Sequence, residues 1–283
     1  MAIIPIDSFD QAIEDAVFWL NDNAAALFDS ARWILDAAYG AVGFLFSAPP
    51  YPVVVLLTLL AGWFFVGRLF GVGAALGLWL CSLMGLWRET VDTLTLVVSS
   101  TLVALLIAIP LGIAVGLAPR ATKAADVMLD FIQTMPPYIY LLPGIALLGY
   151  GPATAMCATS LVAIPPALRL TAHGIRSTPL QFRELGAAVG MTPLELLFKV
   201  RIPIAMPAIL AGVNQSLMLG FGMVVIAGIV GSGGLGQAIY DAVRTLQVDR
   251  SINAGIAIVI LSIVLDRFSQ RLGALKSAGQ ADE

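Results

Sequence analysis

The sequence predicts an all-α, polytopic transmembrane helix bundle, because its composition and its charge distribution are typical of a membrane protein. Of the 283 residues, 59% are hydrophobic and 12% are charged, and the mean hydropathy is +0.92. A soluble domain has about 25% charged residues and about 45–50% apolar ones, so a soluble fold is excluded. Backbone amides in hydrocarbon need internal partners, which favours helices. Five uncharged stretches are each long enough for a membrane helix: 37–67, 69–87, 93–119, 131–168 and 202–240.

We divide these apolar regions into about seven spans, at about 52–67, 69–87, 93–118, 128–149, 152–168, 204–229 and 252–266. With the N-terminus outside, eleven of the 15 Lys and Arg residues fall on the cytoplasmic side, and the exceptions are Arg32, Arg88, Arg244 and Arg250. The positive-inside rule therefore predicts an N-out, C-in topology. The spans divide the chain into two N-terminal transmembrane helices (49–87), a core domain (88–272) and a cytoplasmic tail (273–283).

Residues 1–48 form a separate unit with seven acidic residues and a single basic residue, Arg32. Their apolar residues recur at spacings of three and four, which predicts an amphipathic helical region. We expect this region to lie along the outer face of the membrane or against the bundle. A structural role for this region, as a scaffold for the first spans, is a simpler interpretation than a regulatory role.

The longest polar connector, 169–203, lies on the cytoplasmic side by the charge count. We expect a helix that begins near Pro179 and ends at Gly190, with an apolar face made of Phe182, Leu185, Ala188 and Val189. A second short helix should begin at Thr192, which can cap it, and at Pro193, which fits a first turn. Exposed apolar residues on such a helix-turn-helix outside the membrane need a partner surface.

This connector resembles the EAA coupling loop of binding-protein-dependent ABC importer permeases. The family pattern is Glu-Ala-Ala, three residues, Gly, nine residues, Ile, any residue, Leu-Pro. Five residues of this chain match it at the same spacing: Glu184, Gly190, Val200, Ile202 and Pro203. The two alanines are replaced by Leu185 and Gly186, which alters the packing expected for the first helix. The alternative is a solvated connector with ordinary helix punctuation, and it does not account for five matches directly before a span.

A wider resemblance over roughly 88–272 indicates the branch of these permeases that imports glycine betaine, proline betaine, choline and similar quaternary amines, with trimethylamine N-oxide importers nearby. It rests on stretches such as WRETVDTLTLV, DFIQTMPPYIYLLP and MVVIAGIVGSGGLGQ. The resemblance implies a type I ABC importer permease fold in the bacterial inner membrane. It also implies a homodimer, a pair of cytoplasmic ATPase subunits and a periplasmic solute-binding protein.

The same resemblance implies that the chain couples ATP hydrolysis on partner subunits to import by alternating access. The residues expected to couple to the ATPase are Glu184, Leu185, Gly186, Gly190, Met191, Thr192, Pro193 and Pro203. We expect no catalytic residue, metal or cofactor on this chain. None of its lysines stands in the Gly-x-x-x-x-Gly-Lys-Ser/Thr pattern that holds phosphates, so ATP and magnesium should bind to the partner. The net charge of -3 and the scattered basic residues predict no nucleic-acid partner.

Helix-breaking and polar residues are concentrated in the fourth span, which predicts part of the translocation path. Prolines free backbone carbonyls and bend a membrane helix, and this is tolerated where protein or a water-filled cavity supplies new partners. The two tyrosines of this span could face a methylammonium group through cation–π attraction, or they could be packing aromatics at the membrane interface. The path residues expected on the fourth and sixth spans are Gln133, Thr134, Pro136, Tyr138, Tyr140, Asn214, Gln215 and Met218.

The glycine-rich stretch GSGGLG at 231–236 lies on the outer side in this topology. A tight re-entrant turn or a docking surface for the binding protein fits it better than a phosphate loop. Three other functions stay open: an ion-coupled carrier or channel, a membrane scaffold, and an ABC permease for another solute such as an amino acid. No ionisable residue lies near the centre of a span, which disfavours ion coupling.

Overall fold

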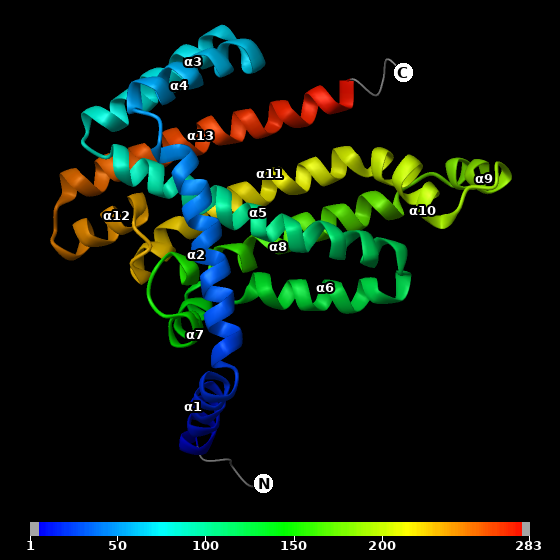
Figure 1. Cartoon of the computed structure of the whole chain (residues 1–283), viewed down its shortest axis with the longest axis horizontal. Helices are drawn as coiled ribbons and strands as arrows, with labels where there is room; N and C mark the ends of the chain where they lie inside the picture. The colour runs from blue at the N-terminus through cyan, green and yellow to red at the C-terminus, as the bar shows by residue number, and fades with distance from the viewer. Residues whose placement is uncertain (1–5, 279–283) are drawn as a thin grey trace.

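The computed structural model describes residues 6–278, and every regular element in this range is a helix (Figure 1). Four of these helices belong to segments that are long and apolar enough to cross a membrane: α5 (Trp87–Leu117), α8 (Pro152–Arg176), α11 (Ile202–Ala227) and α13 (Val248–Ala278). Up to six crossings result if each of two bent helix pairs counts as one. The all-α membrane architecture is therefore confirmed, whereas the number of seven spans stays a prediction.

Helices α5, α8 and α11 form the centre of the bundle, where small residues allow the backbones to approach closely. A Cβ atom on Gly212 of α11 would lie 3.0 Å from the Cα atom of Ala167 in α8. A Cβ atom on Gly112 of α5 would lie 2.8 Å from the carbonyl oxygen of Leu168. Such interfaces hold membrane helices together by close packing, since lipid is as apolar as the side chains. The main core cluster includes Leu96, Val97, Met156, Phe221 and Val224.

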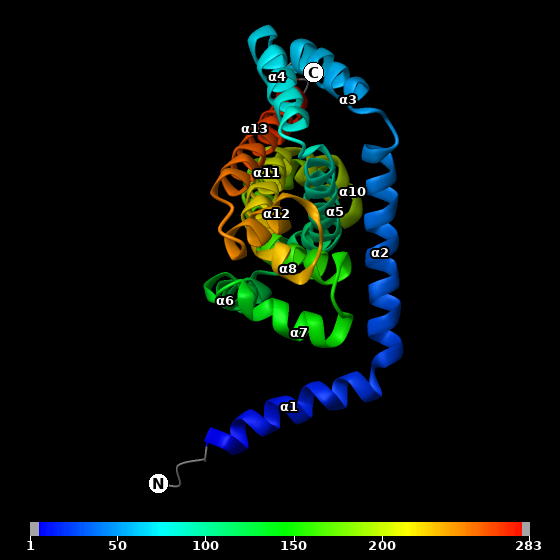
Figure 2. The same cartoon turned by 90° about the vertical axis from the view of Figure 1, so that its left-hand side faces the viewer.

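The N-terminal region consists of two helices, α1 (Ile6–Asn23) and α2 (Ala25–Ser47). Helix α2 runs across the bundle and contacts α5, α7 and α8, whereas α1 projects beyond the bundle (Figures 1 and 2). The first five residues of the predicted unit 1–48, and 279–283 of the predicted tail, lie outside the described residues.

The two predicted N-terminal spans form a hairpin of short helices that packs on α13 (Figure 2). Helix α3 (Tyr51–Ala61) continues through a π-helical turn, Gly62–Val66, and α4 spans Arg68–Leu83. The hairpin is tight because two glycines meet: a Cβ atom on Gly71 would lie 2.6 Å from the backbone nitrogen of Trp63. Each arm is 16 residues long, which is shorter than a typical span of about 20 residues.

The span predicted over 128–149 is two helices in the structure. Helix α6 (Pro119–Thr134) and α7 (Tyr138–Leu148) are bent by 93° relative to each other. Pro136 and Pro137 cause the break, because proline lacks the backbone N–H and disfavours a helical conformation in the residue before it. Met135 accordingly adopts an extended conformation, with φ -70° and ψ 132°.

The connections alternate between the two ends of the bundle. One end carries the α5–α6 turn, the short helices α9 (Leu180–Ala188) and α10 (Pro193–Leu196), and the C-terminal part of α13 (Figure 1). The opposite end carries the start of α5 and the turn between α12 (Gly234–Arg244) and α13. The C-terminal part of α13 thus lies at the same end as the connector 169–203, as the predicted topology requires, whereas which end faces the cytoplasm stays a prediction.

Candidate functional site

Helices α9 and α10 extend beyond the end of the bundle (Figure 1). The buried hydroxyl of Thr178 donates a 3.0 Å hydrogen bond to the carbonyl oxygen of Ile175, which fixes the chain as it leaves α8. Within α9 only Gly186 is buried, whereas Leu185 and Val189 are 60% and 63% exposed. Helix α9 therefore presents apolar side chains outward.

Gly190 ends α9 in a left-handed conformation, with φ +75°. Its N–H donates to the carbonyl oxygen of Ala187 at 3.1 Å, and the N–H of Met191 donates to the carbonyl oxygen of Gly186 at 2.9 Å. These are the two hydrogen bonds of a Schellman motif, where glycine avoids the steric cost of a Cβ atom. A Cβ atom on Gly186 would lie 2.6 Å from Leu196 Cδ1, so the residue that replaces a family alanine faces α10.

Thr192 begins α10 as the first residue of a capping box. The N–H of Glu195 donates to Thr192 Oγ1 at 3.3 Å, and the N–H of Thr192 donates to Glu195 Oε2 at 3.0 Å. Lys199 Nζ also donates to the same carboxylate, at Oε1 and 2.9 Å. The cap and the position of Pro193 in the first turn agree with the sequence prediction. Glu195 was not predicted, although Thr-x-x-Glu is the sequence signature of a capping box.

Helix α10 continues into α11 without a break. The π-helical turn Leu197–Arg201 joins them, so one helical segment runs from Pro193 to Val230. Pro203 lies in the first turn of α11 and does not end the helix. A π-helical turn accommodates such a residue because the usual bond to the carbonyl four residues earlier is missing there. Any displacement of α10 must therefore act directly on α11.

Six large apolar side chains on or beside α9 and α10 are exposed, and we call them the loop face: Leu180, Phe182, Leu185, Val189, Leu194 and Phe198. Three of them belong to the apolar face expected from the sequence. The other three could have been found by extending the helical periodicity to both flanks of the turn. Glu184 is also exposed on α9. Contiguous exposed apolar surface is typical of a site that contacts another protein or a membrane.

The first group of predicted path residues lies where α6 meets α7. Gln133, Thr134, Pro136 and Tyr138 are all exposed. Tyr140 is half-buried: its hydroxyl donates to the carbonyl oxygen of Ile132 in α6, and its ring packs against the main core cluster. Tyr140 therefore braces the bend, and of the two tyrosines Tyr138 presents the larger part of its ring to the outside.

The second group of predicted path residues lies on α11. Gln215 and Met218 are exposed, whereas Asn214 is half-buried and donates from Nδ2 to Asp266 Oδ1 of α13 at 3.3 Å. Helix α8 lies between α11 and α7 (Figure 2), so the structure does not bring the two groups together within one chain. The pairing of Asn214 with Asp266 was not predicted, because it depends on the register between two helices distant in the sequence.

At the opposite end of the bundle, the glycine-rich stretch forms the turn from α11 into α12. Gly231, Gly233 and Gly234 have positive φ angles of 72°, 77° and 77°, and the N–H of Leu235 donates to Thr93 Oγ1 at 2.8 Å. The tight turn expected from the sequence is therefore confirmed. A polar cavity of about 310 Å³ lies beside it, lined by Arg88, Glu89, Asp92, Gln237, Asp241 and Arg250 among others.

The sequences of known proteins fit this architecture. Residues 108–275 match the family described as binding-protein-dependent transport system inner membrane component. The chain is 36% identical to the glycine betaine/proline betaine transport system permease protein ProW of Escherichia coli, over 96% of this chain and 76% of that protein. It is 35% identical to the glycine betaine transport system permease protein OpuAB of Bacillus subtilis, over 94% of each chain. The trimethylamine N-oxide transport system permease protein TmoV of Pelagibacter ubique is 32% identical, over 78% of this chain and 31% of that protein.

The fold is also found in a solved structure. An inward-facing structure of the MetNI methionine ABC transporter matches with a TM-score of 0.61 and 21% identity, over 70% of this chain and 96% of that chain. The architecture is thus that of a type I ABC importer permease, and this chain belongs to the family of binding-protein-dependent transport system inner membrane components. The resemblance inferred from the sequence is confirmed. Permease subunits of this kind are located in the inner membrane and are not themselves catalytic.

Proposed function

We propose that this chain forms the membrane pathway of an ATP-driven importer for glycine betaine and related quaternary or methylated amines. Relatives named for glycine betaine transport cover nearly the whole chain at 35% and 36% identity, which supports this substrate class. The structural observation that carries the proposal is the loop face, because it lies on α9 and α10, and α10 leads without interruption into α11.

In this proposal the loop face docks on an ATPase subunit that binds ATP and magnesium. Leu185 and Val189 supply apolar contact area, and exposed Glu184 is available to a basic group of that subunit. Gly190 and Thr192 set the angle between α9 and α10 through the Schellman motif and the capping box. Closure of the ATPase pair on nucleotide would push α10, and the continuous helix would carry this movement into the bundle.

A second copy of the chain is proposed to pack against α11. Exposed residues recur there at spacings of three and four and form a continuous stripe: Ile204, Pro207, Ala211, Gln215, Met218, Gly222 and Val225. The described elements of the same chain leave this stripe uncovered. Small residues and a glutamine suit a helix interface or a solute path better than they suit lipid. In a homodimer, Gln215 and Met218 of both copies would line a shared path.

A periplasmic solute-binding protein is proposed to dock at the end of the bundle that carries the glycine turn. The polar cavity there is lined by two arginines and three carboxylates. Arg250 and Glu89 form a long ion pair of 3.9 Å across it. Charges of both signs favour recognition of a polar protein surface, and they determine its orientation and its rate of docking.

Reconstitution of the complete transporter tests the proposed function. In liposomes that contain the chain together with its ATPase partner, the ATPase should hydrolyse ATP faster when the binding protein carries glycine betaine. Uptake of labelled glycine betaine should require ATP. If an amino acid stimulates ATP hydrolysis and no methylated amine does, the permease transports another solute. Solute flux through the chain alone, without ATP, would identify a carrier instead.

A further inference from the structure

Two apolar cavities lie next to each other on one side of the bundle, and we call them together the crevice. One cavity of about 310 Å³ lies between α5, α11 and α13. The other, of about 180 Å³, lies between α5, α13 and the N-terminal helices α2, α3 and α4. Both are lined by Leu265 and Phe268. Along α5 the crevice runs from Trp87 to Leu105, which is about 27 Å at about 1.5 Å per residue. A hydrocarbon chain of lipid length fits this distance.

The crevice is open at the surface of the bundle. Helix α13 diverges from α5 and α11 toward its C-terminal end (Figure 1), and Leu102, which lines the crevice, is 49% exposed. The hydroxyls of Thr58 and Thr90, which line the smaller cavity, are bonded to backbone carbonyls four residues earlier. The hydroxyl of Thr101 in the larger cavity has no partner among the described residues, but the other side chains that line this cavity are apolar except Ser269. Since a void would leave the lining side chains without contacts on one side, an apolar occupant is favoured.

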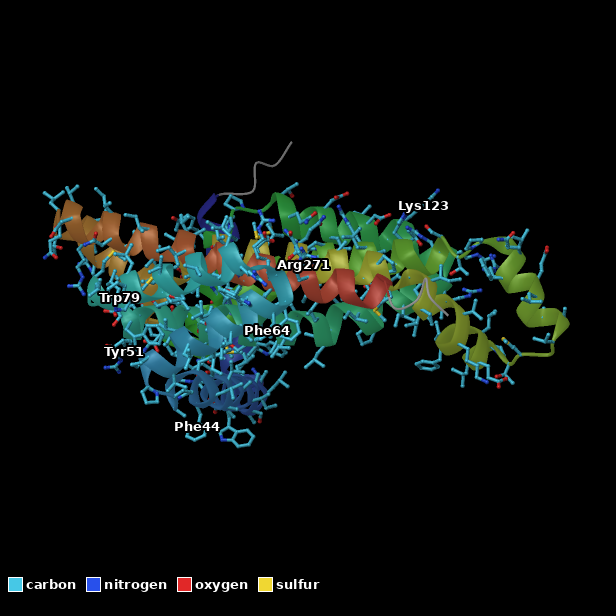
Figure 3. The ribbon with its side chains drawn as sticks, turned by 90° about the horizontal axis from the view of Figure 1, so that it is seen from above. Phe44, Tyr51, Phe64, Trp79, Lys123 and Arg271 are labelled. Atoms are coloured by element: carbon cyan, nitrogen blue, oxygen red, sulfur yellow. The ribbon has the colours of Figure 1, made fainter. Side chains whose placement is uncertain are left out.

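Two arginines lie near Phe268, which lines both cavities: Arg271 is one helical turn further along α13, and Arg68 is two residues before Phe70, which stacks on Phe268. Arg271 donates to the carbonyl oxygen of Val66 at 3.4 Å, where α13 emerges from beneath the α3–α4 hairpin (Figure 3). The guanidinium of Arg68, at the start of α4, lies over the ring of Trp63 at 5.5 Å. Phe70 and Phe268 stack edge to face between the two elements, at 5.8 Å. Within 6–278, neither arginine has a carboxylate at salt-bridge distance.

We propose that the crevice binds one anionic glycerophospholipid. An acyl chain lies along Leu102, Leu105 and Val213, and the phosphate is held between Arg68 and Arg271. Guanidinium groups match phosphate in charge and geometry. Inorganic phosphate alone has no apolar part that could contact the lining of the crevice. A zwitterionic phospholipid would fill the crevice but would gain less from two positive charges. The arginines lie toward the end that carries α9 and α10, so the lipid belongs to the inner leaflet in the predicted topology.

Native mass spectrometry of the full-length chain tests this site. The chain is reconstituted with equal amounts of phosphatidylglycerol and phosphatidylcholine, extracted in mild detergent, and analysed for retained lipid. We expect wild type to retain phosphatidylglycerol preferentially. An Arg68→Gln/Arg271→Gln double variant should lose this preference by about 10- to 30-fold, on the scale of about 1 kcal/mol per arginine near a charged headgroup.

Arg244→Gln is the matched control, because Arg244 also lies over an aromatic ring at 5.5 Å, that of Tyr240, but at the other end of the bundle. It should leave the preference intact. Val213→Trp, which fills the crevice without touching the arginines, should reduce retention of both lipids. An equal preference in wild type and double variant would overturn the proposal, as would disulfide cross-linking of Val213→Cys to a second copy of the chain. These readouts do not depend on transport.

Discussion

At the scale of single residues, Gly190 controls the turn of the loop face. Its φ of +75° costs a residue with a Cβ atom about 1–2 kcal/mol, and more if it is β-branched. We predict that Gly190→Val lowers ATP-dependent uptake at least about tenfold, while insertion into the membrane stays normal, because the distorted turn no longer fits the ATPase. Uptake and ATP hydrolysis in proteoliposomes measure this uncoupling.

Gly190→Asn is the control for this prediction, since asparagine adopts the left-handed conformation more readily than other residues with a side chain. It should keep most of the uptake. If the valine and asparagine variants transport equally, the shape of this turn does not matter for coupling.

Gly236 allows α12 to cross α11 at close range. A Cβ atom there would lie 2.1 Å from the carbonyl oxygen of Val224, which is backbone and cannot move aside. We predict that Gly236→Ala lowers the thermal unfolding midpoint by about 5–10 °C, from an overpacking cost of about 1–3 kcal/mol. Gly255→Ala on α13 is the control, because nothing lies within 4 Å of its Cβ position. Equal midpoints for the two variants would contradict the close crossing.

Single residues in the connector were largely predictable, because local chemistry determines them. A glycine stop and a threonine cap follow from the backbone conformations that helix ends require, and both Gly190 and Thr192 serve in this way. Contacts between distant segments were not predictable. The bond from Asn214 to Asp266 joins residues 52 positions apart, and neither the charge pattern nor the periodicity specifies the register of α11 against α13.

At the scale of elements, the continuous helix from α10 through α11 is the feature that can transmit force. We predict that a Gly-Gly-Ser insertion between Phe198 and Lys199 abolishes uptake, because a flexible link cannot push α11. The ATPase should still bind, since α9 and α10 keep their exposed apolar residues. Co-purification of the ATPase measures docking, and proteoliposome uptake measures coupling.

An insertion of the same three residues after Ala48, in the connection between α2 and α3, is the control for this experiment. That connection is exposed at Ser47 and Ala48 and lies outside both proposed docking sites. Normal uptake with the insertion at Phe198 would show that α10 does not drive α11.

Long elements follow from the sequence more reliably than their breaks do. The apolar parts of α5, α8 and α11 were evident from the long uncharged stretches, and the apolar part of α13 from the shorter run at 252–266. The fourth span was predicted as one segment, although the Pro136–Pro137 pair bends the chain by 93°. Hydropathy alone does not resolve such a bend, because both arms remain apolar. The π-helical turns at Gly62–Val66 and Leu197–Arg201 have no sequence signal of comparable strength.

At the scale of the whole molecule, the polar groups lie at the two ends of the bundle and the exposed apolar groups lie mainly between them. The loop face is one exception, because its apolar residues lie at one end, and exposed Val243, Leu246 and Val248 beside the α12–α13 turn are another. The charged cavity beside the glycine turn lies at the other end. In the proposed function each end of the bundle meets a different partner, so the chain needs a fixed orientation in the membrane. This orientation is testable because residues at the two ends can be labelled separately.

Two exposed glutamines report this orientation. Gln181 lies on α9 and Gln247 lies in the α12–α13 turn, at opposite ends of the bundle. In a background where Cys81 and Cys157 are replaced by alanine, we predict that Gln247→Cys reacts with a membrane-impermeant maleimide in spheroplasts. Gln181→Cys should react only after the membrane is permeabilised, because a coupling loop must face the compartment that contains ATP. The cysteine-free chain controls for background labelling. Labelling of Gln181→Cys from outside would reverse the topology, and the loop face could then not meet a cytoplasmic ATPase.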